Sequence, residues 1–129
     1  METDKLTILK FQQLHLDYDK TVAVIKIEFE QIKVFLLLRK NNINRRVGMN
    51  LINEYNTYIF ELTQDVQYHC GDLPQHHNIS TENQRNIDLI LNYALIIRTL
   101  LNTDSLNINI IDHQLELCEK VPEIIRALQ

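Results

Sequence analysis

The side chains best suited to chemistry gather in one short stretch. It holds one cysteine and three histidines: His69, Cys70, His76 and His77. Thiolate and imidazole are common zinc ligands, and His113 or Cys118 could complete such a set from the last segment. However, one Cys with scattered His matches no standard zinc spacing. The pattern favours a helix end with a buried Cys beside a polar loop, and we expect neither metal nor cofactor.

A basic cluster surrounds the predicted first turn. Four cations fall within eight residues: Arg39, Lys40, Arg45 and Arg46. Such side chains can contact nucleic-acid phosphates, but cations also favour the C-terminus of a helix. No aromatic or Gly-rich context accompanies them. We therefore expect a solvated helix end, with any contact to nucleic acid indirect.

Paired carboxylates are the remaining candidates for catalysis, namely Glu28 with Glu30 and Glu116 with Glu119. Lysines lie at helical spacing from both pairs, so ion pairing on a helix surface explains them better than acid–base chemistry. The chain has no phosphate loop, dinucleotide fingerprint, nucleophile elbow or HExxH motif. The sequence predicts a protein that is not an enzyme.

One long apolar seam organises the first third of the chain. Its residues follow steps of three and four, the a/d pattern of packed helices: Ile8, Phe11, His15, Tyr18, Val22, Ile25, Phe29, Ile32 and Leu36. No Gly or Pro interrupts residues 1–47. Asp17 and Asp19 mark the best place for a break, since Asp favours caps. Because the seam runs through them, we expect one helix over about residues 5–40.

The two halves of this predicted helix differ. Residues 1–20 have one apolar side and are interpreted as a protruding arm. After Val22 the opposite side is apolar too, which predicts burial on all sides. Lys26 and Lys33 stand where coiled coils place partner-selecting charges. A His in the seam can set register or respond to pH, although a partly exposed His is the simpler reading. The predicted partner-binding residues are Ile8, Phe11, His15, Tyr18, Lys26 and Lys33.

Three more segments follow. Asn41–Asn44 is expected to be a turn, and a helix is expected over about 44–70, ended by Gly71. The main loop should then cover 71–80 and include Pro74. The seam of this helix is predicted to be Ile52, Tyr55, Ile59, Leu62 and Val66.

A third helix should begin near Ser80 or Thr81, because Thr81 and Gln84 fit a capping box. Its predicted seam is Ile87, Ile90, Ala94, Ile97 and Leu101, and a turn is expected over 102–105. Residues 106–112 alternate like a strand but also fit a helical face, and helix is favoured because the chain offers no partner strand. Pro122 should kink or split this last helix. Its expected face is Leu106, Ile110, His113, Leu117, Val121, Ile124 and Leu128.

Composition sets the scale of the fold. The chain has 129 residues, 45% of them hydrophobic, with only two Gly and two Pro. These values predict one all-α domain over residues 1–129, an antiparallel bundle of about four helices with a long N-terminal helix. Net charge is −4, and two Cys are too few for a disulfide framework. With no signal peptide and no membrane-length apolar run, we expect an intracellular protein, cytoplasmic or nuclear, that does not enter membranes.

Residues 22–36 resemble a helix of the GINS family, small subunits of the replicative helicase complex. One branch carries a Glu-x-Glu-Arg-Ile-Arg-x-x-Leu pattern, which Glu28, Glu30, Ile32 and Leu36 match, while Gln31 and Lys33 replace the arginines. Ile79-Ser80 with Glu82 is similar to a helix opening of that family, with spacing that differs by one residue. Val121-Pro122-Glu123 falls where such chains leave the helical domain. The family's small β-domain is absent, and the resemblance covers about a third of the chain.

The resemblance implies a non-catalytic scaffold subunit that binds other proteins, as part of a DNA-replication assembly. The seam by itself predicts a protein–protein interaction in a hetero- or homo-oligomer. The alternative is a small regulator from a mobile element, such as an immunity, anti-defence or inhibitor protein that binds one target through a helical face. A constitutive multi-subunit complex favours the scaffold, and a single tight binary complex favours the regulator.

Overall fold

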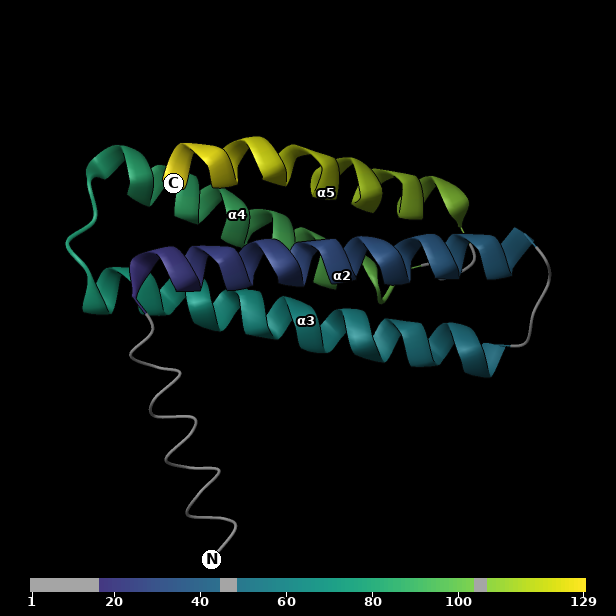
Figure 1. Cartoon of the computed structure of the whole chain (residues 1–129). Coiled ribbons are helices and arrows are strands. Elements are labelled where there is room, and N and C mark those ends of the chain that lie inside the picture. The colour runs from purple at the N-terminus through teal and green to yellow at the C-terminus, as the bar shows by residue number, and fades with distance from the viewer. Residues whose placement is uncertain (1–16, 45–48, 104–106) are drawn as a thin grey trace, which may run out of the picture.

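The computed structural model describes residues 17–44, 49–103 and 107–129. These form four helices: α2 (Tyr18–Asn44), α3 (Met49–His76), α4 (Thr81–Leu100) and α5 (Ile108–Leu128). Each helix packs on two others, α2 on α3 and α5, and α4 on the same two (Figure 1). The predicted all-α antiparallel bundle is confirmed.

Contacts between the helices fix their directions. Along α2, Glu28 meets His69 of α3, and Phe35, seven residues later, meets Tyr58, which comes earlier in α3. Near the other end of α2, Lys40 holds Asp112 at the start of α5. At the ends of the chain, the Tyr18 hydroxyl donates to the Leu128 carbonyl oxygen at 2.8 Å. Neighbouring helices are therefore antiparallel around the ring, and the C-terminus closes against the start of α2.

The core follows the predicted seams closely. Val22, Ile25, Phe29, Ile32 and Leu36 are buried, as is the whole predicted seam of α4. On α5 the predicted face is only partly right, because His113 is exposed and Ile125 is more deeply buried than Ile124. The central core of the bundle is lined by these four seams.

Helix α2 starts and stops later than expected. The Asp17 carboxylate accepts a hydrogen bond from the Lys20 backbone N–H at 2.8 Å, so Asp17 caps a helix that begins at Tyr18. The prediction of an unbroken helix through Asp17 is wrong for that reason. The helix continues through Asn41–Asn44, where a turn was predicted. Most of the predicted arm, residues 1–16 of 1–20, lies outside the described residues, and the rest is Asp17 and the first turn of α2.

Helix α3 runs past Gly71 to His76, so the predicted main loop at 71–80 shrinks to 77–80. Gly71 does not adopt a left-handed backbone conformation and does not end the helix. Leu73 is completely buried in the core, and its packing favours two more helical turns despite Pro74. Gly71 is therefore an ordinary helical residue.

The start of α4 and the course of α5 refine two further predictions. Ser80 is the N-cap of α4, and its hydroxyl accepts from the Asn83 backbone N–H at 3.1 Å, so a capping box at Thr81 is wrong. Residues 108–112 are helical, as favoured, and Asn107 caps them. Pro122 does not split α5, since Val121 and Ile125 on either side are anchored in the core. None of the helices described is both long and apolar enough to cross a membrane.

Candidate protein-interaction surface

An apolar stripe runs along the side of α2 that faces away from the bundle. Ile27 and Val34 are about half exposed, at 51% and 53%. We define the outer stripe as Ile27, Val34, Leu37 and Leu38. The expectation of burial on all sides is wrong here, because α2 is a corner helix with neighbours on only two sides. Its third apolar side is left in solvent.

A groove between α2 and α3 adjoins the stripe. The Phe35 ring packs against the rings of Tyr58 and Tyr55, at centroid distances of 5.1 Å and 6.1 Å. The Tyr58 hydroxyl donates to Glu54 at 2.9 Å, which holds that ring in place. The groove has a volume of about 360 Å³ and is lined by Gln31, Val34, Phe35, Tyr58, Glu61, Leu62 and Asp65.

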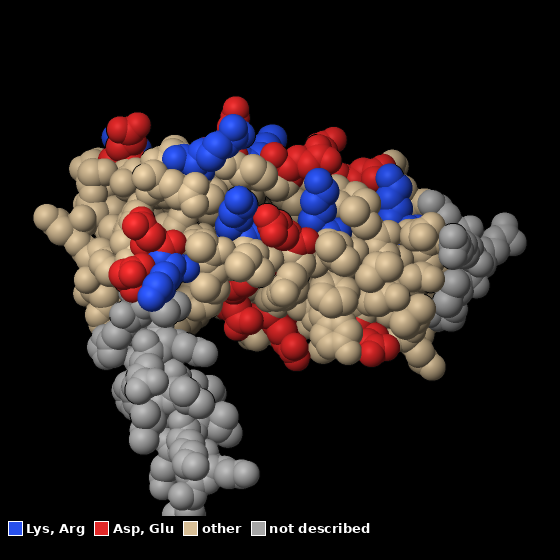
Figure 2. Space-filling view, in the orientation of Figure 1, with Lys and Arg blue, Asp and Glu red and all other residues tan. Residues whose placement is uncertain are grey.

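Charges of opposite sign border this apolar surface. On the α5 side of α2, at seven-residue steps, we define the lysine row as Lys26, Lys33 and Lys40. On α3 we define the carboxylate row as Glu54, Glu61 and Asp65. Figure 2 shows an uncharged band along α2, with acidic side chains along its lower edge and basic and acidic side chains intermixed along its upper side. On the α5 side, Glu30 and Glu119 lie beside Lys26 and Lys33. The surface therefore has an apolar middle, one acidic edge and one edge that carries both signs.

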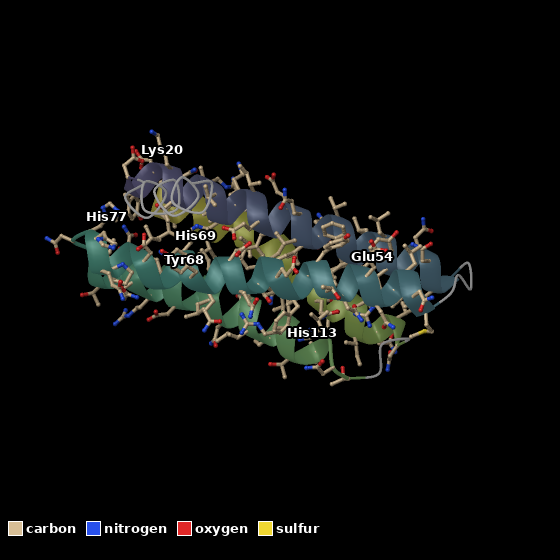
Figure 3. All side chains as sticks on the ribbon, turned by 90° about the horizontal axis from the view of Figure 1, so that it is seen from below. Lys20, Glu54, Tyr68, His69, His77 and His113 are labelled. Atoms are coloured by element: carbon tan, nitrogen blue, oxygen red, sulfur yellow. The ribbon has the colours of Figure 1, made fainter. Side chains whose placement is uncertain are left out.

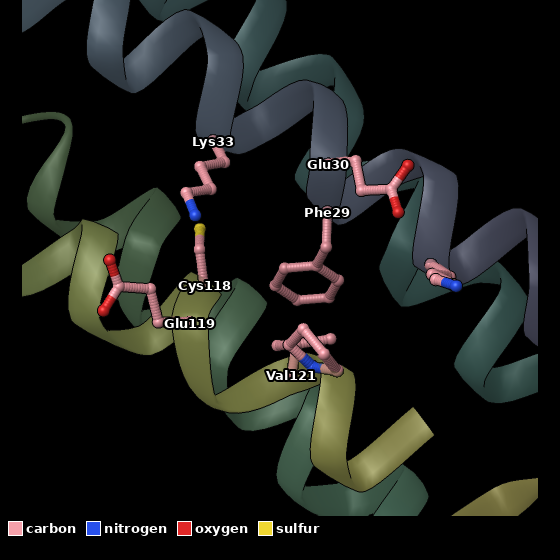
Figure 4. Close-up of a pocket in the computed structure, with 8 residues that line it drawn as sticks. Phe29, Glu30, Lys33, Cys118, Glu119 and Val121 are labelled. Atoms are coloured by element: carbon pink, nitrogen blue, oxygen red, sulfur yellow. The ribbon is translucent and has the colours of Figure 1, made fainter. Parts of the chain in front are cut away.

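A second cleft lies between α2 and α5. Lys33 and Cys118 point toward each other across it, and Phe29 and Val121 form its floor (Figure 4). Burial raises the pKa of Cys118 to about 12, and the nearby Lys33 charge offsets only part of that effect. The thiol is thus a buried neutral group. The cleft has a volume of about 300 Å³, and Lys26 and Lys33 of the lysine row are among its lining residues.

The predicted partner-binding residues lie in different surroundings. Ile8, Phe11 and His15 lie outside the described residues. Tyr18 packs within its own chain, with its ring edge-on to His77 and its hydroxyl on Leu128. Lys26 is exposed and Lys33 is half-buried, both on the flank of α2. In the described residues the exposed apolar surface of α2 therefore lies on the outer stripe and not on the seam.

The predicted basic cluster does not form one surface. Arg39 is 0% exposed, so its guanidinium does not reach the surface where a phosphate would bind, and the predicted solvated helix end is wrong for this residue. Lys40 holds Asp112 of α5 at 2.6 Å. Arg45 and Arg46 lie outside the described residues.

The His and Cys residues that were weighed as zinc ligands lie in different surroundings. Cys70 is buried, and burial raises its pKa to about 12. His76 lies 3.2 Å from Asp72, and His77 lies against Tyr18. Figure 3 shows His113 well away from His69 and His77. Within the part of the chain that the structure describes, no three His, Cys, Asp or Glu side chains are grouped to hold a metal.

The buried pair of Glu28 and His69 is the feature that the sequence analysis missed. Glu28 was expected to pair with surface lysines, but it is 6% exposed and lies 2.7 Å from His69 Nδ1. Burial raises the pKa of Glu28, and His69 offsets that effect only in part. Burial lowers the pKa of His69, but the hydrogen bond and charge of Glu28, helped by Asp65 and Asp72, leave it raised.

Sequence spacing contained a signal for this pair. Glu28 follows Ile25 by three residues and precedes Ile32 by four, so it borders the core face. His69 has the same relation to Val66 and Leu73. A carboxylate and an imidazole at the edges of two core faces are candidates for a contact between helices.

No protein family, curated protein or solved structure matches this chain.

Proposed function

We propose that this chain is a non-catalytic subunit that binds another polypeptide through the outer stripe and the α2–α3 groove. The observation that carries the proposal is the exposure of four large aliphatic side chains on one side of one helix. Contiguous exposed apolar surface on a folded protein commonly marks an interaction site.

The composition of the surface supports this role. Protein interfaces combine an apolar or aromatic centre with a charged rim that orients the partner. Here Phe35 and Tyr58 line the groove next to Val34, and the lysine and carboxylate rows form the two edges. The surface is therefore suited to a helix or helical bundle with apolar side chains along one face.

The likeness of residues 22–36 to the GINS family concerns the same helix. It remains a prediction, and it would make the partners other subunits of a replication assembly. The alternative, a small regulator with one target, uses the same surface and differs in the number of partners.

A differential purification tests the proposal. Complexes are isolated with the wild-type chain, with Ile27→Lys/Val34→Glu, and with the control Leu89→Lys/Ile96→Glu on α4. The control residues are comparable exposed aliphatics, at 38% and 37%. We expect the stripe variant to lose its associated polypeptide and the control to retain it. Equal association of all three chains, with unchanged circular dichroism, would contradict the proposal.

A further inference from the structure

We infer that the polypeptide on the outer stripe is a second copy of this chain, with the two α2 helices parallel around a two-fold axis that runs along them. This inference rests on the proposed function, because it names the partner of the same surface.

Charge selects the parallel arrangement. Two copies can join the same face about a two-fold axis that runs either across α2 or along it. An axis across α2 makes the helices antiparallel and sets each carboxylate row against its own copy. An axis along α2 sets the carboxylate row of each copy opposite the lysine row of the other, on both sides of the stripe. Opposed like charges are costly in an interface, so the second arrangement is favoured.

The register of the rows fits the same axis. Rotation about an axis along α2 leaves every residue at its own level. On the antiparallel pair α2 and α3, Glu28 is level with His69 and Phe35 with Tyr58. The constant helical rise then places Lys33 level with Glu61 and Lys40 level with Glu54.

In the parallel dimer each of these lysines therefore lies on the same side of the stripe as a carboxylate of the second copy and at its level. Lys33 points toward Cys118 in the single chain (Figure 4), so it turns out of the α2–α5 cleft to reach Glu61 of the second copy. The level of Lys26 along the dimer axis is within about one helical turn of the level of Asp65 of the second copy. Because Lys40 already holds Asp112 in its own chain, Lys33 and Glu61 are the informative pair.

The available area suits a weak dimer. The outer stripe from Ile27 to Leu38 spans ~17 Å of α2 at 1.5 Å per residue, and the α2–α3 groove widens it. This apolar surface is smaller than the ~800 Å² per copy of a standard stable interface, so we expect weak self-association.

Sedimentation velocity tests whether the second copy is the occupant. We expect the wild-type chain to dimerise at tens of micromolar, Val34→Glu to be monomeric, and Ile96→Glu to remain dimeric. A wild-type chain that stays monomeric up to ~100 µM overturns the inference. The proposed function would survive that result if the differential purification still showed loss of a different protein with the stripe variant.

Charge exchange tests the direction of the helices. Lys33→Glu and Glu61→Lys should each raise the dimer dissociation constant about tenfold, since each change creates two repulsive pairs per dimer. The double variant Lys33→Glu/Glu61→Lys should return to within about threefold of the wild type. Additive weakening in the double variant would overturn the parallel arrangement.

Disulfide trapping gives an independent readout. Along a parallel two-fold axis each stripe residue meets its own copy, so Ile27→Cys and Leu38→Cys should each form a covalent dimer on oxidation. The native thiols of Cys70 and Cys118 are buried, with their pKa values raised to about 12, and will not compete. Trapping only in a mixture of the two variants would indicate antiparallel helices and overturn the inference.

Discussion

At the scale of single residues, ionisable side chains lie in the interior of this bundle as well as on its surface. Glu28 and His69 form a buried pair that joins α2 to α3, and Arg39 is completely buried near the other end of α2. Buried ionisable groups are retained only where partners compensate for lost hydration. The Glu28–His69 pair therefore couples the stability of the bundle to pH.

The first prediction concerns that coupling. Both pKa values are raised, so the folded chain binds more protons than the unfolded chain between about pH 4.5 and the raised pKa of Glu28, and between about pH 6.5 and the raised pKa of His69. The free energy of unfolding should therefore fall as pH rises through these windows. Thermal melts of the wild type between about pH 5 and pH 8 measure the slope.

Glu28→Gln removes the carboxylate and leaves burial as the main influence on His69. Its melting temperature should fall less steeply with pH than that of the wild type, or rise. Glu30→Gln, an exposed carboxylate on the same helix, is the control and should keep the wild-type slope. Identical slopes for all three chains would show that the pair does not govern this dependence.

At the scale of helices, the ends are set by local capping and by core contacts beyond the caps. Asp17 and Ser80 each accept a hydrogen bond from the backbone N–H three residues later, and a helix starts after each. At the end of α3, by contrast, the buried Leu73 carries the helix past a glycine that resembled a stop. Capping residues therefore determine where α2 and α4 begin, whereas core packing determines where α3 ends.

The N-cap of α4 gives the second prediction. Ser80→Ala removes the acceptor for the Asn83 N–H and should lower the free energy of unfolding by ~1 kcal/mol. Thr81→Ala is the matched control and should change it by only a few tenths, since Thr81 lies on the exposed first turn. Urea unfolding at a fixed pH distinguishes the two. A larger loss of stability from Thr81→Ala than from Ser80→Ala would instead support Thr81 as the N-cap of a capping box.

Gly71 gives the third prediction. It is exposed within α3, and a Cβ added there meets nothing within 4 Å. Gly71→Ala should therefore stabilise the protein by ~0.5–1 kcal/mol, because alanine restricts the unfolded chain and favours helix. Chemical denaturation measures the change. Destabilisation would mean that the helix ends at Gly71 in a left-handed conformation.

At the scale of the whole molecule, the four-helix ring decides which apolar residues are covered. Helix α2 contacts α3 and α5, so its core face is closed and its outer side remains open. Ile25 is buried, while Ile27, two residues later, is half exposed in the outer stripe. The same residue type on the same helix is therefore part of the core at one position and part of exposed apolar surface at the other.

The fourth prediction compares these two isoleucines. Ile25→Asp buries an unpaired carboxylate, at a cost of several kcal/mol that approaches the ~5–15 kcal/mol stability of a domain, and should unfold the chain. Ile27→Asp should leave circular dichroism unchanged and weaken only self-association. Loss of structure in both variants would show that the outer stripe is covered by the chain itself.

The sequence by itself determined the fold class and most of the core. Seams with helical periodicity placed Ile87, Ile90, Ala94 and Ile97 in the interior, and all four are buried, because period and hydrophobicity are local properties of the chain. Two charged residues show where this reasoning ends. Spacing places Glu28 at the border of the core face and Arg39 three residues beyond Leu36 in the seam, but spacing alone does not show whether a neighbouring helix covers them.

Only the tertiary structure decided which helix occupies a corner of the ring and which flanks meet across it. That choice buried Glu28 beside His69, enclosed Arg39, and left the outer stripe in solvent. The seam of α2 predicted its inward face, but the second apolar side of the helix looks the same in the sequence whether or not a neighbour covers it. Packing leaves that side open, so the candidate interaction surface follows from the arrangement of the helices and not from any motif.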